Sequence, residues 1–452
     1  GGQRGLAVRL DADGVGVVLL DAETGIRAGT EVSRTGEVAQ VPVGDALLGR
    51  ILDPLGRPLD DRPAIEAASF EAIERPAPAI IDRELVTEPL RTSQLVVDAM
   101  IPLGRGQREL VIGDRTTGKT SLAVDAMLSQ KDTDVVCVYA AVGQKGSAVR
   151  RVIETVRAHG AFDRSIFVIA EADAPPGLQW IAPAAACTMA EFFRDRGGHA
   201  LLVIDDLTKH AAIHRQISLL LRSPPGREAY PGDIFHLHAR LLERAAKLGH
   251  ARGGGSLTAL PIAETLSGNL TAYIPTNLIS ITDGQIYLTP DLFNEGIRPA
   301  VDVGKSVSRV GGKAQPPVIR ELAAKLKLEY SQFLELEVFT RFGQMVDAAT
   351  QRVIDHGRRI RAVLVHPRSQ PVSLAGQVAI LLALRERVLD ELTLDGVRSF
   401  EQHLDADLRA SLPGLVERLA GGAGLAAEDH DVLLPWLHAR AAKLKSPAAA
   451  KA

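Results

Sequence analysis

Hydrophobic and polar positions change their spacing along the chain of 452 residues, and three regions result. Between Leu6 and Leu10 apolar and polar residues alternate, and the turn pair Asp13-Gly14 that follows predicts a β-hairpin. Apolar strands then alternate with helical patterns, as in proteins with a parallel α/β sheet. Beyond Pro316 the apolar residues recur at helical spacing, which predicts a purely helical region.

These regions predict an α/β fold with three domains, which cover residues 1–40, 41–315 and 316–452. A length of 452 residues agrees with this number, since one domain takes roughly 150 residues. The clearest strands of the middle region are the apolar runs at 111–112, 135–142, 165–170 and 200–204.

One segment fits the pattern G-x-x-x-x-G-K-[ST] of a phosphate-binding loop, and its residues are Gly113, Asp114, Arg115, Thr116, Thr117, Gly118, Lys119 and Thr120. An apolar strand precedes the segment, and a helical pattern begins at Ser121. Glycines allow backbone N–H groups to converge on phosphate oxygens, and the lysine adds a cation. Because the threonine offers a hydroxyl to Mg²⁺, the segment predicts a site for ATP or ADP with Mg²⁺.

A second element of such a site lies where the apolar run 201–204 ends in two carboxylates, Asp205 and Asp206. In nucleotide-binding proteins with a phosphate loop, an aspartate at the end of a downstream strand holds Mg²⁺. We expect Asp205 to be that residue, because it is the first residue after the strand. Asp206 could instead cap the helix that follows.

Composition limits the cell compartments and the classes of partner that are compatible with this chain. The net charge of −3 gives no general attraction to nucleic acid. The cysteines, Cys137 and Cys187, form no disulfide framework, which favours a reducing compartment. No apolar run approaches the roughly 20 residues of a membrane-spanning helix.

These motifs resemble those of α subunits of F-type (rotary) ATP synthases, whose phosphate loop is close to residues 113–120. Pro299–Ser308 (PAVDVGKSVS) is similar to the signature that α and β subunits of rotary ATPases share. The resemblance covers nearly the whole chain and keeps the order of the motifs. Further similar stretches are 142–145, 202–207, 219–233, 237–247, 253–265, 273–287 and 296–315.

The resemblance implies a RecA-like central domain with the phosphate loop, between a partial N-terminal β-barrel and a C-terminal helical domain. It implies an alternating α3β3 ring with β subunits, around a central stalk γ subunit and held by a peripheral stalk. Such a complex couples ATP synthesis or hydrolysis to proton or Na⁺ transport through a membrane sector. The chain would then be a peripheral membrane protein on the cytoplasmic face of the bacterial plasma membrane.

Gln144 distinguishes the two kinds of ring subunit, because catalytic subunits carry a glutamate at the matching position. A neutral amide can orient water but cannot serve as a carboxylate base. Some nucleotide hydrolases do position water with a glutamine. With the α-like motifs, Gln144 favours a regulatory, non-catalytic ATP site in this chain.

The resemblance also implies residues that act at neighbouring sites. Arg309 matches the arginine that α subunits extend to the catalytic site of a β subunit, where a guanidinium stabilises charge on the transferred phosphoryl group. Ser306 and Ser280 match residues near the same interface. Together these residues would contribute in trans to catalysis at the β site.

The chain also departs from the family pattern. Thr116 replaces the usual glutamine of the phosphate loop, while Arg298 and Pro299 keep the adenine-facing pair. His366 and Arg368 stand where the family places two glutamines near the adenine, so the base preference of this site is an open question. The family's α chain begins well upstream of residue 1, so we expect its first barrel strands to be missing here. Such divergence suggests a second, alternative ATPase of this type, with Na⁺ as a candidate coupling ion.

Other classes of function stay open. An autonomous homohexameric ATPase of the protein-export type would need its own glutamate in place of Gln144. A hexameric RNA-translocating motor would need a basic or aromatic RNA-binding barrel, whereas residues 1–40 contain no Phe, Tyr or Trp. We therefore expect no nucleic-acid partner. A ring component with an empty nucleotide site is the remaining alternative.

Overall fold

The computed structural model describes residues 2–341, 347–422 and 424–445. The chain forms two compact units, and each unit is built from separate stretches of sequence. The first unit comprises Gly1–Val86 with Arg105–Pro290, and the second comprises Thr87–Gly104 with Asp291–Ala452. The three domains expected from the sequence remain a prediction.

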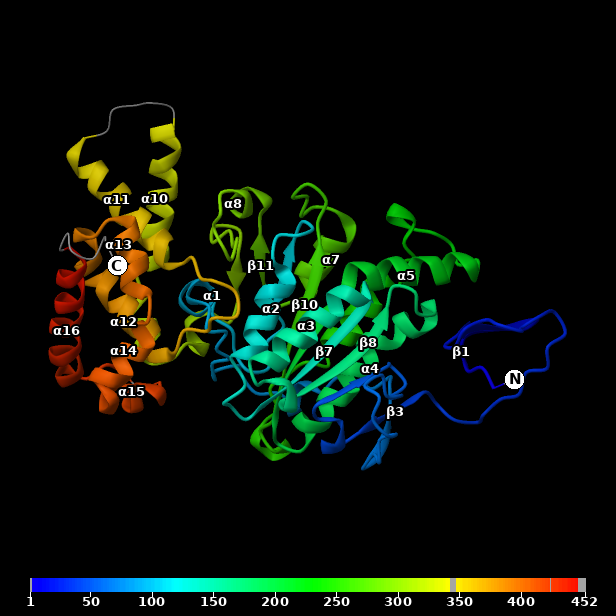
Figure 1. The fold of residues 1–452 in the computed structure, drawn as a ribbon. Coiled ribbons are helices and arrows are strands. Elements are labelled where there is room, and N and C mark those ends of the chain that lie inside the picture. The colour runs from blue at the N-terminus through cyan, green and yellow to red at the C-terminus, as the bar shows by residue number, and fades with distance from the viewer. Residues whose placement is uncertain (1, 342–346, 423, 446–452) are drawn as a thin grey trace. The chain divides into compact units, whose positions relative to one another are not determined.

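A parallel sheet forms the core of the first unit (Figure 1). Its strands within this unit lie in the order β11-β6-β10-β9-β7-β8-β4, and neighbouring strands run parallel. Parallel strands are covered on both faces, which explains their nearly continuous apolar sequences. The strands are β4 (Arg50–Leu52), β6 (Leu110–Gly113), β7 (Val135–Gln144), β8 (Ser165–Glu171), β9 (His199–Asp205), β10 (Ser256–Glu264) and β11 (Gly284–Leu288).

Helices pack on this sheet, so the α/β class predicted from the sequence is confirmed. Helix α4 contacts β7, β8 and β9, α5 contacts β7 and β10, and α2 contacts β6 and α3. The helices of the first unit are α2 (Lys119–Leu128), α3 (Gly146–Ala158), α4 (Pro176–Asp195), α5 (Leu207–Leu220), α6 (Ile234–Leu242) and α7 (Tyr273–Ile281).

Two antiparallel strand pairs lie in the N-terminal part of the first unit. The predicted hairpin at Asp13-Gly14 is confirmed, because β1 (Gly5–Asp11) pairs with β2 (Gly14–Leu19). A second pair joins β3 (Gln40–Val43) to β5 (Ser69–Ala72). The partial β-barrel expected for residues 1–40 remains a prediction.

The second unit is mainly helical, as the spacing beyond Pro316 predicted. Helix α12 is mostly apolar, and its residues 374–384 are all buried, as expected for a helix surrounded by others. None of the helices in the described part of the chain has the length and apolar character needed to cross a lipid bilayer. The elements are α1 (Leu95–Met100), α8 (Pro290–Asn294), β12 (Val307–Ser308), α9 (Pro317–Leu322), α10 (Leu326–Arg341), α11 (Ala348–Val363), α12 (Leu374–Arg385), α13 (Leu394–Glu401), α14 (Leu404–Ser411), α15 (Pro413–Ala420) and α16 (Ala427–Lys445).

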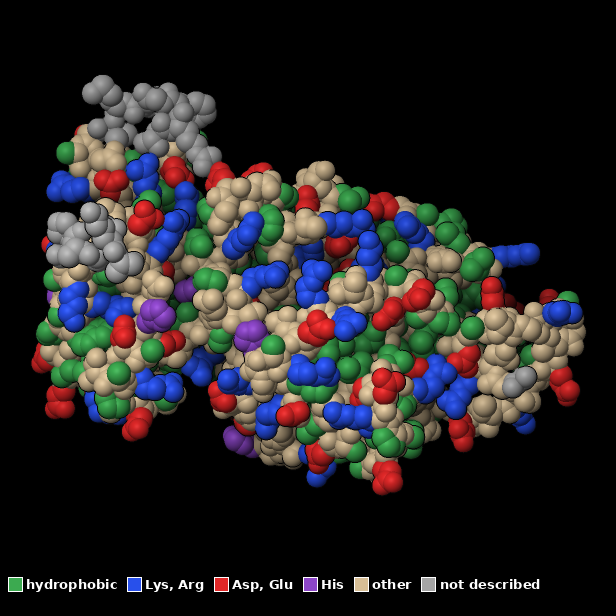
Figure 2. Space-filling model, in the orientation of Figure 1, with side chains coloured by type: hydrophobic (Ala, Val, Ile, Leu, Met, Phe, Trp, Pro, Cys, Tyr) green, Lys and Arg blue, Asp and Glu red, His purple; other side chains and the backbone are tan. Residues whose placement is uncertain are grey.

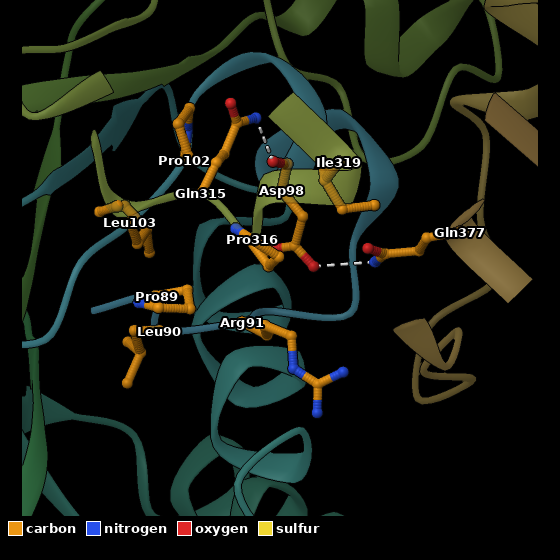
Figure 3. Close-up of a pocket in the computed structure, with 11 residues that line it drawn as sticks. Pro89, Leu90, Arg91, Asp98, Pro102, Leu103, Gln315, Pro316, Ile319 and Gln377 are labelled. Carbon is orange, nitrogen blue, oxygen red and sulfur yellow. Dashed lines mark hydrogen bonds between the residues drawn. The ribbon is translucent and has the colours of Figure 1, made fainter. Parts of the chain in front are cut away.

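A buried carboxylate joins the two stretches of sequence that make the second unit. Asp98 of α1 accepts hydrogen bonds from the backbone N–H and the Oγ1 hydroxyl of Thr92, at 2.8 Å each. It also accepts one of 2.8 Å from Nε2 of Gln377 in α12 (Figure 3). Burial raises the pKa of Asp98 above its ordinary value, against the effect of these donors. Oε1 of Gln377 has no hydrogen-bond partner among the described residues.

We predict that Asp98→Ala destabilises the second unit by about 3 kcal/mol, because it removes the acceptor of several buried donors. Asp98→Asn should stay within about 1 kcal/mol of wild type, because the Gln377 amide can turn its Oε1 towards the new N–H group. The measurement is urea unfolding in a Trp180→Phe background, which leaves Trp436 of α16 as the fluorescent reporter. Equal losses in both variants would show that the carboxylate charge itself is needed.

Candidate nucleotide-binding site

The phosphate loop connects β6 to α2, and its backbone requires glycine at both ends. A Cβ atom on Gly113 would lie 2.2 Å from the carbonyl oxygen of Leu288 in β11. Gly118 has a φ of 100°, in the left-handed region that glycine adopts without strain. Helix α2 begins at Lys119, earlier than the Ser121 predicted from the pattern, because Gly118 occupies the N-cap position.

Lys119 and Thr120 therefore lie in the first turn of α2, where backbone N–H groups form an anion site. Lys119 Nζ donates to the carbonyl oxygens of Gly113, at 3.0 Å, and Asp114, at 2.6 Å. Burial lowers the pKa of Lys119, while nearby carboxylates, of which Glu264 acts most strongly, oppose the shift. The ammonium is thus held at the loop by backbone carbonyl groups.

Residues at and just after the end of β10 hold the phosphate loop in place by hydrogen bonds and an ion pair. Asp114 Oδ1 accepts hydrogen bonds from Oγ1 of Thr265, at 2.5 Å, and from the backbone N–H of Gly268, at 2.9 Å. Arg115 Nε pairs with Glu264 Oε2 at 2.9 Å. Thr117 Oγ1 donates to the carbonyl oxygen of Asp114 at 2.8 Å. Thr116 is exposed and has a φ of 63°.

Asp205 is the last residue of β9, whereas the sequence pattern predicted it as the first residue after the strand, and its side chain contacts Thr120 of the loop. Its Oδ2 accepts hydrogen bonds of 2.8 Å from Thr120 Oγ1 and from the Tyr139 hydroxyl. Its Oδ1 accepts one of 2.6 Å from Gln144 Nε2. Burial raises the pKa of Asp205, and the donors from Thr120 and Tyr139 counteract it. A hydroxyl and a carboxylate so close together are hard oxygen ligands, which suit Mg²⁺.

Asp206 takes the capping role that the sequence left open. Its Oδ1 accepts a hydrogen bond of 2.7 Å from the backbone N–H of Lys209, so Asp206 is the N-cap of α5. Burial raises the pKa of Asp206 to about 7. Gln144 Nε2 also lies 3.3 Å from Asp206 Oδ2, and Gln144 Oε1 accepts a hydrogen bond of 2.7 Å from Lys209 Nζ.

Tyr139 and Lys209 also lie at the site, although no sequence motif predicted them. Tyr139 stands inside an otherwise apolar strand, and a buried hydroxyl needs a partner. That requirement was a usable signal for a polar contact, although it does not name Asp205. Lys209 had no such signal, because an exposed face of a helix commonly carries lysine.

The proposed adenine-facing residues lie in the second unit, on two segments that a hydrogen bond joins. The backbone N–H of His366 donates to the carbonyl oxygen of Arg298 at 2.8 Å. Burial lowers the pKa of His366 to about 4, so the imidazole is neutral at pH 7. Its Nε2 has no hydrogen-bond partner among the described residues. Arg298 lies over the Phe293 ring, 4.4 Å from its centre, and Arg368 is exposed.

The residues expected to act in trans lie on both units. Arg309 follows β12 in the second unit and is exposed. Ser306 is fully buried there, and its Oγ donates to the carbonyl oxygen of Asp302 at 2.6 Å. Ser280 is exposed on α7 of the first unit, where its Oγ donates to the carbonyl oxygen of Thr276 at 2.9 Å.

A glycine-bounded loop at a helix N-terminus, a lysine, and a threonine beside a strand-end aspartate together define a nucleotide-binding site of the P-loop class. Residues 93–308 match the nucleotide-binding domain of the ATP synthase alpha/beta family, and residues 315–438 match the C-terminal domain of its alpha/beta chains. The chain therefore belongs to the ATP synthase alpha/beta family.

Two bacterial proteins named as ATP synthase alpha subunits are similar to the chain. The chain is 58% identical over 433 residues to ATP synthase subunit alpha 3 of Paraburkholderia xenovorans (strain LB400), covering 96% of this chain and 80% of that protein. It is 59% identical over 429 residues to ATP synthase subunit alpha 2 of Burkholderia pseudomallei (strain 1710b), covering 95% and 65%. The chain thus spans less than two-thirds of the second relative's length.

We predict that Lys119→Ala weakens ATP binding by at least about tenfold without unfolding the chain, because a charge-assisted contact to phosphate is lost. Lys131→Ala, which removes an exposed lysine of the same unit, is the matched control and should bind as wild type does. Calorimetric titration measures both affinities. Unchanged affinity in a folded Lys119→Ala variant would reject the site.

Proposed function

We propose that this chain is the non-catalytic, ATP-binding α subunit of a rotary ATP synthase. The observation that carries the proposal is the place of Gln144, at the end of β7 and bonded to Asp205 beside the phosphate loop. In this position a catalytic subunit needs a carboxylate base, whereas an amide cannot take up a proton at neutral pH. The similarity to proteins named ATP synthase subunit alpha supports the same assignment.

The nucleotide would be ATP or ADP with Mg²⁺. Lys119 and the first-turn N–H groups of α2 would bind the phosphates, and Thr120 and Asp205 would hold the metal. When bound, Mg²⁺ neutralises phosphate charge and fixes the phosphate geometry. Arg298, Pro299, His366 and Arg368 would face the base. A neutral His366 has one N–H donor and one acceptor nitrogen, so it could form hydrogen bonds with an adenine edge as a glutamine amide does.

The chain would contribute to catalysis at a neighbouring β subunit. The exposed Arg309 would reach the transferred phosphoryl group there, and Ser306 and Ser280 would line the same interface. An arginine finger is effective because its planar guanidinium matches the charge that spreads over phosphoryl oxygens.

The proposed assembly is an α3β3 ring with a γ central stalk, a peripheral stalk and an ion-translocating membrane sector. It would couple ATP synthesis or hydrolysis to proton or Na⁺ transport at the cytoplasmic face of the bacterial plasma membrane. Acidic and basic side chains are interspersed on the face that Figure 2 shows, in keeping with a net charge of −3. Such a mixed surface favours protein partners over an RNA-translocating function. Gln144 also disfavours an autonomous export-type ATPase.

The isolated chain should show negligible Mg²⁺-dependent ATP hydrolysis, because Gln144 supplies no base. Phosphate release by the highly purified chain tests this prediction, with Lys119→Ala as the control for contaminating ATPases. Robust turnover that disappears in the Lys119→Ala variant would instead indicate an autonomous enzyme.

Arg309→Ala should reduce ATP hydrolysis by the assembled ring 10³–10⁵-fold, equivalent to about 4–7 kcal/mol of transition-state stabilisation. Arg309→Lys should restore little, since an ammonium lacks the planar fork. The assay reconstitutes each variant with wild-type β subunits and measures turnover together with ring assembly.

Arg320→Ala, an exposed arginine of the same unit, is the control and should keep wild-type turnover. Turnover within a few-fold of wild type in an intact Arg309→Ala ring would show that Arg309 is not the finger.

A further inference from the structure

Lys209 contacts Gln144, the residue on which the proposed non-catalytic role rests. Its Nζ donates to Gln144 Oε1 at 2.7 Å and lies 3.6 Å from Asp206 Oδ2. We propose that Lys209 is a positioning residue, which fixes the Gln144 amide so that its nitrogen supports the Asp205 carboxylate. This inference rests on the proposed function, because it assigns Asp205 to Mg²⁺.

Charges on both sides determine which way the amide faces. In the orientation found, Gln144 Nε2 faces Asp205 Oδ1 at 2.6 Å and Asp206 Oδ2 at 3.3 Å, while Oε1 faces the ammonium. A rotation that exchanged the amide oxygen and nitrogen would place the oxygen against two carboxylates and the N–H₂ group against a cation. An ammonium and an amide N–H₂ group are both donors only, so the rotated amide would lose its bond to Lys209.

Lys209 is itself held by the fold. Its backbone N–H donates to the Asp206 carboxylate that caps α5, which places the side chain in the first turn of the helix. Gly143 gives the side chain room, because a Cβ atom there would lie 3.4 Å from Lys209 Cδ and 2.8 Å from Gln179 Oε1. Gly143 also has a φ of 61°, a conformation that glycine tolerates best.

With the Gln144 amide held in this orientation, both oxygens of the Asp205 carboxylate accept hydrogen bonds. Gln144 holds Oδ1, and Thr120 and Tyr139 hold Oδ2, so the carboxylate has one defined orientation. Residues that orient a metal-binding carboxylate typically change metal affinity 10–100-fold when they are removed. Lys209 acts one step further out, through the amide that it fixes.

The contact with Lys209 also bears on whether Gln144 can position an attacking water. Glutamines that position an attacking water need their amide atoms for the water and the phosphate. Here the oxygen accepts from Lys209, and the nitrogen donates to Asp205 and Asp206. Gln144 is thereby a support for the metal-holding carboxylate.

The test compares the affinity of the full-length chain for ATP in excess Mg²⁺ with its affinity for ATP in EDTA. We expect Lys209→Met to reduce the ratio of the two affinities at least about tenfold. Lys209→Arg, which keeps a donor to Oε1, should retain most of the ratio. Lys145→Met removes an exposed lysine next to Gln144 and is the matched control with wild-type behaviour.

A double-mutant cycle separates positioning from a simple effect of charge. In a Gln144→Met background there is no amide to orient, so adding Lys209→Met should leave the ratio unchanged within about twofold. The inference is overturned if Lys209→Met lowers the ratio equally in both backgrounds, or leaves it unchanged in the wild-type background. Failure of the wild-type chain to bind ATP at all would count instead against the proposed function.

Discussion

The site depends on a single constraint, which is the burial of the Asp205 carboxylate at the end of β9. A buried carboxylate is stable only when hydrogen bonds or cations replace the water that it loses. Three side chains supply those donors: Thr120 from α2, and Tyr139 and Gln144 from β7. Strand β7 lies beside β9 in the sheet, and α2 packs against β9 and β10. The requirement of one side chain therefore links the phosphate loop to the strand that carries Gln144.

The parallel sheet makes that convergence possible. In the order β6-β10-β9-β7, the carboxyl ends of all four strands meet at one edge, which is where α/β proteins bind ligands. Gly113, Glu264, Asp205 and Gln144 are the last residues of these strands. Long apolar strands are thus needed for function, because they bring residues far apart in sequence to one edge.

This geometry also explains how much could be predicted. The phosphate loop, the hairpin, the main strands and Asp205 follow from local patterns of spacing and residue type. The contacts of Tyr139 and Lys209 were not predictable, because they depend on neighbours across the sheet edge that no local pattern names. The same limit applies to Asp98, whose partner Gln377 is distant in sequence. Local periodicity indicates that a segment is helical or extended, and it leaves open which buried polar group will meet which donor.

The neutral amide of Gln144 suits the carboxylates that surround it. Two buried carboxylates, Asp205 and Asp206, already share the edge, and burial raises the pKa of both. A third carboxylate, 2.6 Å from Asp205 in place of the amide nitrogen, would repel both and favour protonation of one of them. A neutral amide avoids this repulsion, and it donates to the carboxylates while it accepts from Lys209. In the proposed non-catalytic site, the amide that supplies no base thus also stabilises the aspartate proposed to hold Mg²⁺.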